Sequence, residues 1–352
     1  MITERPLHTA YPRLASALAH LPLAQLPTPI CPLPGSGPWF CKDDGGTHTL
    51  YGGNKVRKLE YVFGQAQRHG CTQVATFGAA GSNHATATAL HAQRLGLRCI
   101  NFLSRQRQTP WVANNIKRQL ASGAQLVFVD GHRVQREQQA QDVLDASAHK
   151  TWLIPMGGSS IAGTVGYVNA AFELRDQIKR GEMPVPRRVY APLGTMGTVV
   201  GLALGFAAVG LATEVVGVRV VHESIGSEAQ AKALYAKTAR ALHRLDPQFP
   251  ALDYASAKLT VRNEFFGAGY AVATDEARAA VDFAADHWAL KLETTYSGKA
   301  AAALLADSSN DASGTSLFWS TYSSPTSTPE PDASLLDTLP RALHSYLVPQ
   351  VS

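Results

Sequence analysis

The sequence predicts an α/β fold in which parallel sheets are covered by helices. Strand-like apolar runs alternate with helical patterns from residue 56 to residue 320. Alternation of this kind is typical of right-handed βαβ units, whose strands pair in parallel beneath their helices. The chain has 352 residues, which is long for one domain, and 45% of them are hydrophobic, as in globular proteins. We therefore expect two α/β domains.

Strands and helices are expected in turn along most of the chain. Short apolar runs predict strands at residues 73–77, 98–103, 125–129, 151–155, 187–192, 214–221, 258–263 and 315–320. Longer periodic patterns predict helices at residues 56–69, 83–95, 111–122, 133–149, 164–180, 197–211, 226–244, 275–290 and 297–306. Residues 323–329, within a Ser-, Thr- and Pro-rich tail, are expected to form an extended loop. The leucines from Leu335 to Leu347 predict one short closing helix.

The charge of the chain disfavours a nucleic-acid-binding protein. The net charge is +5, but the basic residues are scattered, and the densest clusters, at residues 55–58 and 187–188, are too short for a nucleic-acid surface. A mild positive bias suits anionic small ligands such as a phosphate or a carboxylate. Only 17% of the residues are charged, which suits large buried areas, an oligomer interface among them.

Other classes of protein are disfavoured by missing patterns. The four cysteines show neither a CxxC pair nor metal-ligand spacing, no His-x-x-x-His pair occurs, and we expect no bound metal. No apolar run reaches the roughly 18 residues that a membrane span needs, so no membrane protein is expected. Residues 1–6 do not resemble a signal peptide, and nothing implies disulfides, so a cytoplasmic protein is the expectation.

The most informative segment is residues 52–60, Gly-Gly-Asn-Lys-Val-Arg-Lys-Leu-Glu, where a turn leads into a predicted helix. Partial burial of Lys55 at this junction would disfavour its charged form and make the amine more nucleophilic. Such an amine can form a Schiff base with an aldehyde cofactor. Lys58 is the nearest alternative, but we expect it to pack or to pair with Glu60 or a neighbour. Taken alone, the segment fits a surface lysine at least as well.

A second turn, residues 78–84, follows a predicted strand and begins a predicted helix. Ser82 or Asn83 is a natural N-cap there. The first turn of a helix leaves backbone N–H groups without intrahelical partners, and such a helix end binds anions, carboxylates included. Ordinary capping explains the pattern equally well.

A third turn, residues 194–198, Gly-Thr-Met-Gly-Thr, lies between a predicted strand and a small apolar helix. Glycines let the backbone approach a ligand closely, and Thr195 and Thr198 offer hydroxyl donors. The combination suits a phosphate at a helix N-terminus. The pattern gains weight only from its position between strand and helix.

A carbonyl-trapping lysine, a carboxylate site and a phosphate site thus follow one another, and pyridoxal phosphate with an amino acid would fill all three. In these features the chain resembles the D-cysteine desulfhydrase and 1-aminocyclopropane-1-carboxylate (ACC) deaminase family of tryptophan-synthase-β-like pyridoxal phosphate enzymes. The resemblance extends from about residue 20 to residue 322, and the lysine motif is its most specific part. The matching segments are Lys42 to Asp44, Gly53 to Glu60, Ser82 to His84, Pro155 to Ser159, Gly163 to Tyr167, Gly194 to Thr198, Gly267 to Tyr270 and Tyr296 to Ala300.

The resemblance implies the fold type II architecture, with two open, mostly parallel sheets and the cofactor between two domains. A small inserted domain at residues 56–165 would interrupt a large cofactor-binding domain made of residues 1–55 and 166–352. In open α/β sheets ligands bind at the carboxyl ends of the strands, so the site is expected there. A homodimer is also expected from the resemblance.

The family pattern implies a role for individual residues of this chain. Lys55 would carry the cofactor and, once freed, take or return a proton, while Tyr296, with Tyr270 as its companion, would act as nucleophile or acid–base group. Ser82 completes the catalytic set. The expected cofactor-binding residues are Lys55, Asn54, Asn83, Gly194, Thr195, Met196, Gly197, Thr198 and Thr321. The expected substrate-binding residues are Ser82, Asn83, His84, Tyr270 and Tyr296. Without the family pattern, buried structural roles would explain the two tyrosines and the histidine.

Some positions depart from the family. ACC deaminases have a glutamate directly after the tyrosine, near the pyridine nitrogen, where this chain has Ser297. The desulfhydrase branch uses a neutral hydroxyl within a His-Thr-Gly-Gly segment, and Thr321 fits that role although residues 320–323 are Ser-Thr-Tyr-Ser here. Gly81 stands in place of a glutamine, and Met196 in place of a glycine.

The leading hypothesis is a pyridoxal phosphate lyase that performs α,β-elimination on a small amino acid, D-cysteine first, giving sulfide, pyruvate and ammonia. The runner-up is ACC deaminase, which Ser297 disfavours. A racemase or dehydratase of another small amino acid is a further alternative. A non-catalytic pyridoxal phosphate-binding protein is the last, suggested by the changes at residues 320–323.

Overall fold

The computed structural model describes residues 5–35, 37–310, 314–323 and 327–348, and the chain divides into two compact units. Unit 1 consists of Met1–Tyr61 and Ser159–Ser324, and unit 2 of Val62–Gly158 and Pro325–Ser352. The predicted domains, residues 1–55 with 166–352 and residues 56–165, remain a prediction. The units differ from them in grouping the C-terminal residues with unit 2, where Gln106 and Arg118 hydrogen-bond to those residues.

Unit 1 contains, within the described ranges, a six-stranded sheet in the order β1-β2-β10-β7-β8-β9. All neighbouring pairs are parallel except the antiparallel pair of β1 and β2. The last strand in sequence, β10, lies inside the sheet between β2 and β7. The strands are β1 (Ile30–Leu33), β2 (Trp39–Asp43), β7 (Arg188–Leu193), β8 (Glu214–Arg219), β9 (Leu259–Arg262) and β10 (Ser316–Ser320).

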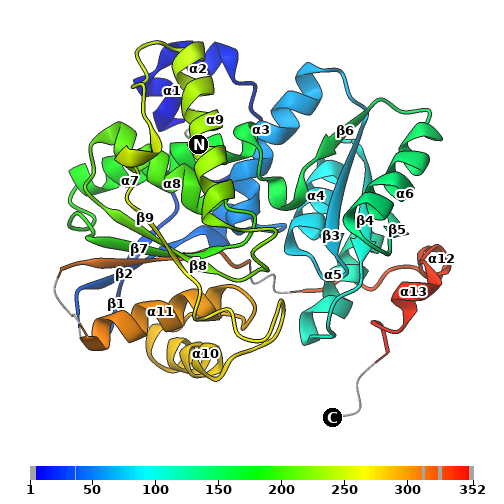
Figure 1. Ribbon diagram of the computed structural model, residues 1–352. Helices are drawn as coiled ribbons and strands as arrows, with labels where there is room; N and C mark the ends of the chain where they lie inside the picture. The colour runs from blue at the N-terminus through cyan, green and yellow to red at the C-terminus, as the bar shows by residue number, and fades with distance from the viewer. Residues whose placement is uncertain (1–4, 36, 311–313, 324–326, 349–352) are drawn as a thin grey trace. The chain divides into compact units, whose positions relative to one another are not determined.

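Helices cover both faces of this sheet, with α7 and α8 on one face and α10 and α11 on the other (Figure 1). The alternation of side chains along β7 explains the two cores, because Val189 and Ala191 belong to the cluster with α7 and α8 while Tyr190 belongs to the cluster with α11. The helices are α1 (Pro6–Ala10), α2 (Pro12–Ala17), α3 (Asn54–Arg68), which continues into unit 2, α7 (Ile161–Lys179), α8 (Gly197–Val209), α9 (Glu228–Leu245), α10 (Asp275–Trp288) and α11 (Ser297–Asn310), with short 3-10 turns η1 (Asp44–Thr47) and η3 (Tyr254–Ser256).

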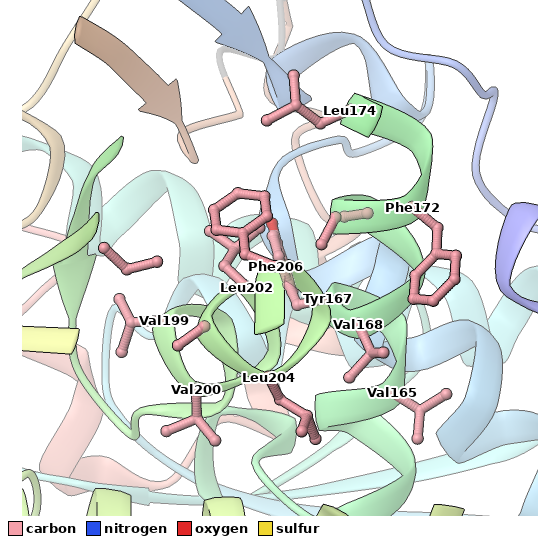
Figure 2. Packing of buried hydrophobic residues seen from close by; sticks show 14 of the residues in the cluster. Val165, Tyr167, Val168, Phe172, Leu174, Val199, Val200, Leu202, Leu204 and Phe206 are labelled. Carbon is pink, nitrogen blue, oxygen red and sulfur yellow. The ribbon is translucent and has the colours of Figure 1, made fainter. Parts of the chain in front are cut away.

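The packing of α7 against α8 depends on glycines. Figure 2 shows their apolar side chains gathered in one cluster. A Cβ at Gly201 would lie 2.5 Å from the Cβ of Tyr167, and a Cβ at Gly205 would lie 2.4 Å from the Cβ of Ala171. The backbone of α8 at these two glycines therefore packs directly against side chains of α7. This close packing fixes the position of α8 after β7.

Unit 2 contains, among the residues described, a four-stranded parallel sheet in the order β5-β4-β3-β6. Its small core includes Ala75, Ile100 and Phe102 from the sheet and Ala140 from the helix that covers it. The elements are β3 (Gln73–Ala79), α4 (Asn83–Arg94), β4 (Arg98–Ser104), α5 (Pro110–Ala121), β5 (Gln125–Phe128), α6 (Arg133–Asp145), β6 (Thr151–Ile154), η2 (Met156–Gly158), α12 (Ala333–Asp337) and α13 (Arg341–His344).

The fold predicted from the sequence is confirmed, with all expected strands present and two mostly parallel sheets. The prediction of one closing helix is wrong, because Pro340 separates α12 from α13. Of the expected loop at residues 323–329, residues 324–326 lie outside the described residues, and residues 327–329 have no regular structure. Within the described ranges, the helices are too short or too polar for a transmembrane segment.

Candidate active site

Lys55 lies in the first turn of α3, at the end of a tightly held turn. Gly53 has a φ of 86°, which favours glycine, and a Cβ there would lie 2.8 Å from the Thr321 carbonyl oxygen. The same carbonyl accepts a hydrogen bond from the Asn54 N–H at 3.1 Å. The Ser323 hydroxyl accepts another hydrogen bond, from the Gly52 N–H of the turn, at 2.9 Å. The residues after β10 thus fix the position of the lysine, and Ser323 uses a hydroxyl that the family's glycine lacks.

A buried cluster of charges anchors α3 two residues beyond Lys55. The Arg57 guanidinium contacts Asp44 at 2.8 Å and Glu173 at 2.9 Å, and the Lys42 amine contacts Glu173 at 2.7 Å. Two aromatic side chains, from α7 and β10, donate further hydrogen bonds to Asp44. Burial alone would raise the pKa of Glu173, but the charges of Arg57 and Lys42 outweigh it and hold that pKa below its usual range. The Glu173 carboxylate therefore stays ionised inside the protein.

The amine of Lys55 is partly buried, and burial lowers its pKa to about 8. At pH 7 about one tenth of the amine is then neutral, compared with less than about one thousandth for an ordinary lysine. The neutral amine is the nucleophilic form. The residue expected to trap a carbonyl therefore has the chemical property that this reaction requires.

Lys58 lies one turn further along α3 and is buried, so it packs, which was one of the two expectations for it. Glu60, the partner named for it, is bonded instead to Arg5. The Lys58 amine lies 3.2 Å from the Ser159 hydroxyl, and a Cβ at Gly197 would lie 3.1 Å from it. Burial first, and then the neighbouring lysine, lower the pKa of Lys58. Sequence reasoning considered Lys58 only as the alternative to Lys55 and missed its place beside Ser159 and Gly197, although two lysines three residues apart share a helix face.

The turn between β7 and α8 forms a cradle for an anion. The Ser159 hydroxyl lies 2.8 Å from the Thr195 hydroxyl and accepts the Gly197 N–H at 3.1 Å. The Asn54 amide donates to the Thr198 hydroxyl at 3.1 Å. A Cβ at Gly197 would lie 2.8 Å from the Ser159 oxygen, so glycine leaves this space to polar groups. Together with the helix dipole and the nearby lysine amine, these donors fit a phosphate group.

Met196 occupies the left-handed region of the backbone, with a φ of 69°. A residue with a Cβ loses about 1–2 kcal/mol in this conformation, whereas glycine does not. This explains why the resembling family has glycine at the position. In this chain a methionine adopts the conformation, at a cost in strain.

Two tyrosines from separate loops meet in unit 1. The hydroxyls of Tyr270 and Tyr296 lie 2.6 Å apart. Burial first, and then the neighbouring phenol, raise the pKa of Tyr296 well above its usual value, and burial also raises the pKa of Tyr270. Both phenols are therefore protonated at neutral pH. A Cβ at Gly194 would lie 3.8 Å from the ring of Tyr296, so the pair is next to the phosphate cradle.

Ser297 contributes to capping α11. Its hydroxyl accepts the Glu293 N–H at 3.0 Å, and its own N–H donates to the Glu293 carboxylate at 2.9 Å. The same carboxylate accepts the N–H groups of Thr295 and Tyr296, each at 2.8 Å. These capping hydrogen bonds thus fix the backbone of Tyr296.

The turn at the start of α4 lies in unit 2. The Ser82 hydroxyl caps the helix by accepting the Ala85 N–H at 3.2 Å. The Asn83 carbonyl oxygen of the side chain accepts a hydrogen bond from the Asn115 amide at 2.9 Å. His84 is buried, and its Nε2 lies 3.0 Å from the Thr76 hydroxyl of β3. His84 thus points into the sheet of unit 2, which is the structural arrangement that a histidine in a first turn often has.

The predicted site residues are therefore distributed over both units. Unit 1 brings together Lys55, the cradle at residues 194–198 and the two tyrosines, and unit 2 holds the capped turn at residues 82–84. Thr321 contributes its carbonyl to the turn before Lys55, and the proposed role of its hydroxyl stays a prediction. Nowhere in the described part of the chain do three or more His, Cys, Asp or Glu side chains gather as a metal site would require.

Comparison with known proteins agrees with this set of groups. A family model described as pyridoxal-phosphate dependent enzyme matches residues 21–321. The chain is 34% identical over 322 residues to a nocardicin C-9′ epimerase of Nocardia uniformis subsp. tsuyamanensis, covering 87% of this chain and 93% of that relative. It is 31% identical over 309 residues to a D-cysteine desulfhydrase of Klebsiella pneumoniae (strain 342), covering 84% and 88%.

Solved structures agree as well. The crystal structure of an ACC deaminase homologue matches with a TM-score of 0.76 and 26% identity, covering 93% of this chain and 98% of that chain. The crystal structure of a threonine deaminase, at 19% identity and a TM-score of 0.59, shares the fold over 93% of this chain and 100% of that one. The chain therefore belongs to the pyridoxal-phosphate dependent enzymes, within the group of D-cysteine desulfhydrases and ACC deaminase homologues, and its cofactor is pyridoxal phosphate.

Proposed function

We propose that the chain is a lyase that performs α,β-elimination on a small amino acid, with D-cysteine as the leading substrate and sulfide, pyruvate and ammonia as products. The observation that carries the proposal is the pair of protonated phenols, Tyr270 and Tyr296, in the same unit as Lys55. The similarity to two D-cysteine desulfhydrases, each 31% identical, supports the choice of substrate.

Each residue has a defined task in this proposal. When bound, pyridoxal phosphate supplies an electron-withdrawing ring that stabilises negative charge at the α-carbon of an amino acid. The neutral amine of Lys55 accepts the proton from that carbon. Tyr296, with Tyr270 behind it, donates a proton to the sulfur as the carbon–sulfur bond breaks. The 2-aminoacrylate that remains is hydrolysed to pyruvate and ammonia.

Binding is assigned to the two anion sites. The Lys58 amine, the Gly197 N–H and the Thr198 hydroxyl would hold the phosphate, because a dianion there would compensate the lysine charge that burial disfavours. Ser82 and Asn83 would bind the substrate carboxylate and the cofactor ring hydroxyl, at the N-terminus of α4. The buried position of His84 favours a supporting role for it.

A second candidate is an epimerase or racemase, and one observation favours it. The epimerase from Nocardia is 34% identical, slightly more than the desulfhydrases. Both reactions begin with removal of the α-proton, and they differ in whether a β-substituent then leaves. Ser297, in place of a glutamate, continues to disfavour ACC deaminase.

The decisive experiment mixes the cofactor-loaded protein with D-cysteine, L-cysteine and ACC in parallel, in water and in D₂O. Sulfide and 2-oxo acids are assayed, and NMR follows α-deuterium incorporation. Sulfide with pyruvate from D-cysteine supports the proposal. A 2-oxo acid from ACC alone would make the chain a deaminase. Deuterium incorporation with inversion but no sulfide would favour the epimerase. Cofactor absorbance without product or exchange would leave a non-catalytic binding protein.

The role of the phenol pair can be tested with a matched pair of variants. Tyr296→Phe should lower the rate of sulfide formation at least about 100-fold and leave cofactor absorbance intact, because it removes a proton donor only. Tyr235→Phe is the control, since Tyr235 is buried in the same unit and bonds only a surface-side hydroxyl of Ser256 among the bonds described. Full activity of Tyr296→Phe would contradict the assignment.

A homodimer is part of the proposal, supported by the family resemblance. Light scattering of the purified protein would test it, and a monomer at working concentration would contradict it. The cytoplasmic location stays a prediction.

A further inference from the structure

The C-terminal residues 327–348 make contacts within unit 2 that the reaction proposed above does not use. They reach the turn at residues 81–83 by two separate hydrogen-bonded paths. This turn includes Ser82 and Asn83, which we assign to the substrate and the cofactor. The tail and the turn belong to the same unit.

The first path starts at Thr328. The Arg118 guanidinium donates a hydrogen bond to the Thr328 hydroxyl at 2.6 Å and another to the Ser327 carbonyl at 3.1 Å. Arg118 also donates to the Asn115 side-chain oxygen at 3.2 Å. The Asn115 amide nitrogen donates to the Gly81 carbonyl and to the Asn83 side-chain oxygen, both at 2.9 Å. This contact sets the orientation of the Asn83 amide.

The second path starts at Tyr346. Its hydroxyl accepts the Gln106 N–H at 2.9 Å and donates to the Gln106 carbonyl at 2.7 Å. One phenol thus satisfies both backbone groups of a loop residue. The Gln106 side-chain oxygen then accepts the Gly81 N–H at 2.9 Å.

The glycine at position 81 explains why the second path fits. A Cβ at Gly81 would lie 2.9 Å from Val112 Cγ2 and 3.3 Å from the Gln106 amide nitrogen. The space beside the turn is therefore filled by side chains from elsewhere in unit 2. This chain has glycine where the family has glutamine at position 81, and the space beside that glycine is used by Gln106, whose backbone is bonded to Tyr346.

We propose that residues 327–348 are a positioning segment, which holds the turn at residues 81–83 in the geometry that binds the cofactor, through Thr328 and Tyr346. The inference rests on the assignment of Asn83 to the cofactor in the proposed function. Neither Thr328 nor Tyr346 is a catalytic residue, since each acts through the hydrogen bonds of other residues. Loss of either hydroxyl loosens the turn, and loss of both loosens it further, because the paths meet at Gly81.

The test compares Thr328→Val, Tyr346→Phe and the double variant with a matched control, Lys117→Met. Lys117 precedes Arg118 on α5 and pairs with Glu330 of the same segment at 2.7 Å, so its loss weakens the contact with the tail but touches neither path. Hydrogen exchange of the amides at residues 78–86 is measured in the cofactor-free protein. The dissociation constant of pyridoxal phosphate and the visible spectrum of the bound cofactor are then measured for each variant.

Thr328→Val removes one hydrogen bond and Tyr346→Phe removes two, so each should raise the exchange rate of the turn at least about fivefold, and the double variant at least about twentyfold. The dissociation constant of pyridoxal phosphate should rise with them, with a changed cofactor spectrum, while Lys117→Met leaves all three unchanged. Unchanged exchange or unchanged cofactor affinity in the double variant overturns the inference, and so does an equal effect in Lys117→Met. If these readouts respond but the wild-type protein forms no sulfide from D-cysteine, the inference stands and the proposed function fails.

Discussion

The turn before Lys55 and the turn at residues 81–83 are supported by different kinds of interaction. The first, in unit 1, lies beside a buried cluster in which Arg57 joins Asp44 and Glu173. The second, in unit 2, is held by the neutral amides of Asn115 and Gln106. Removing one partner of a buried ion pair leaves an uncompensated charge, whereas removing one neutral hydrogen bond costs far less. Loss of one charged partner should therefore disrupt the first turn almost completely, whereas loss of one amide hydrogen bond should weaken the second turn only in part.

The difference matches the tasks proposed for the two turns. A lysine that traps a carbonyl must be held in one position, whatever the substrate. A turn that binds a carboxylate can be adjusted in small steps as the substrate changes. On this view, substitutions near residues 81–83 can alter specificity without losing the cofactor.

The largest loss of stability is expected when the arginine that supports each turn is replaced. Arg57→Met should lower the free energy of unfolding by about 3–5 kcal/mol, because Asp44 and Glu173 lose their main counter-charge. Arg118→Met should lower it by about 1–2 kcal/mol, because the bonds described for Arg118 go to neutral oxygens. Urea unfolding measures both. Equal losses would show that the two turns are supported alike.

The second prediction concerns the amine that the first turn presents. With a pKa of about 8, Lys55 should give a rate of cofactor capture by the cofactor-free protein that rises with pH to a midpoint near 8. At pH 7 its neutral form is about 300 times more abundant than that of an ordinary lysine. Stopped-flow absorbance at several pH values measures the rate, with Lys258→Ala, which replaces an exposed lysine, as control. A midpoint near 10 would mean that the amine is solvated.

The sign of the linked stability follows from the same shift. Between pH 8 and the ordinary lysine value of 10.5, the folded amine is neutral while the unfolded one is protonated. Unfolding then takes up a proton, so this group makes the cofactor-free protein more stable as the pH rises through that window. Lys55→Met should flatten the corresponding slope of stability against pH.

A third, smaller difference is expected between the glycines of the two turns. Gly53→Ala should destabilise the protein by about 2–3 kcal/mol, because its φ of 86° is unfavourable for alanine and the Thr321 carbonyl blocks the methyl group. Gly81→Ala should cost about 1–2 kcal/mol, since its methyl group would lie 3.0 Å from the backbone Cα of Val112 as well as near side-chain atoms, but no left-handed φ adds to this cost. Thermal unfolding compares the two variants. A larger cost at Gly81 would reverse the comparison.

The smallest effect is a gain in stability. Met196→Gly should stabilise the protein by about 0.5 kcal/mol, because relief of the left-handed strain exceeds the entropy cost of glycine. Cofactor affinity should be unchanged or higher. Urea unfolding checks the first statement and a cofactor titration the second. A loss of stability would mean that the partly buried methionine side chain contributes more packing energy than the backbone strain costs.

Local sequence pattern sufficed for most of the fold, and its failures have a common cause. The apolar runs that predict β3 to β10 lie within single segments, whereas β1 contains Pro32 and β2 ends in the charged residues Lys42 and Asp43, so neither was predicted. The pairing of Glu60 with Arg5 spans 55 positions in the sequence, and no local pattern shows it.

The same limit applies to the candidate site. The turns at Lys55 and at residues 194–198 could be predicted because each is a strand-to-helix or turn-to-helix junction with its own residue pattern. The place of Lys58 beside Ser159, and the paths from Thr328 and Tyr346 to the second turn, depend on contacts between distant segments. Sequence reasoning could flag the glycine at position 81 as unusual, but only the structure shows Gln106 beside it.

The position of β10 has a consequence for the order in which the protein is made. This strand is the last of its sheet in sequence, yet it lies between β2 and β7, and the residues that follow it hold the turn before Lys55. On the ribosome, a nascent chain that ends before residue 316 lacks both the strand and the carbonyl of Thr321. Its lysine has been synthesised but its turn has not been assembled. Capture of the aldehyde cofactor by Lys55, as proposed above, would thus wait for the segment that arranges the lysine, which emerges more than 250 residues after it.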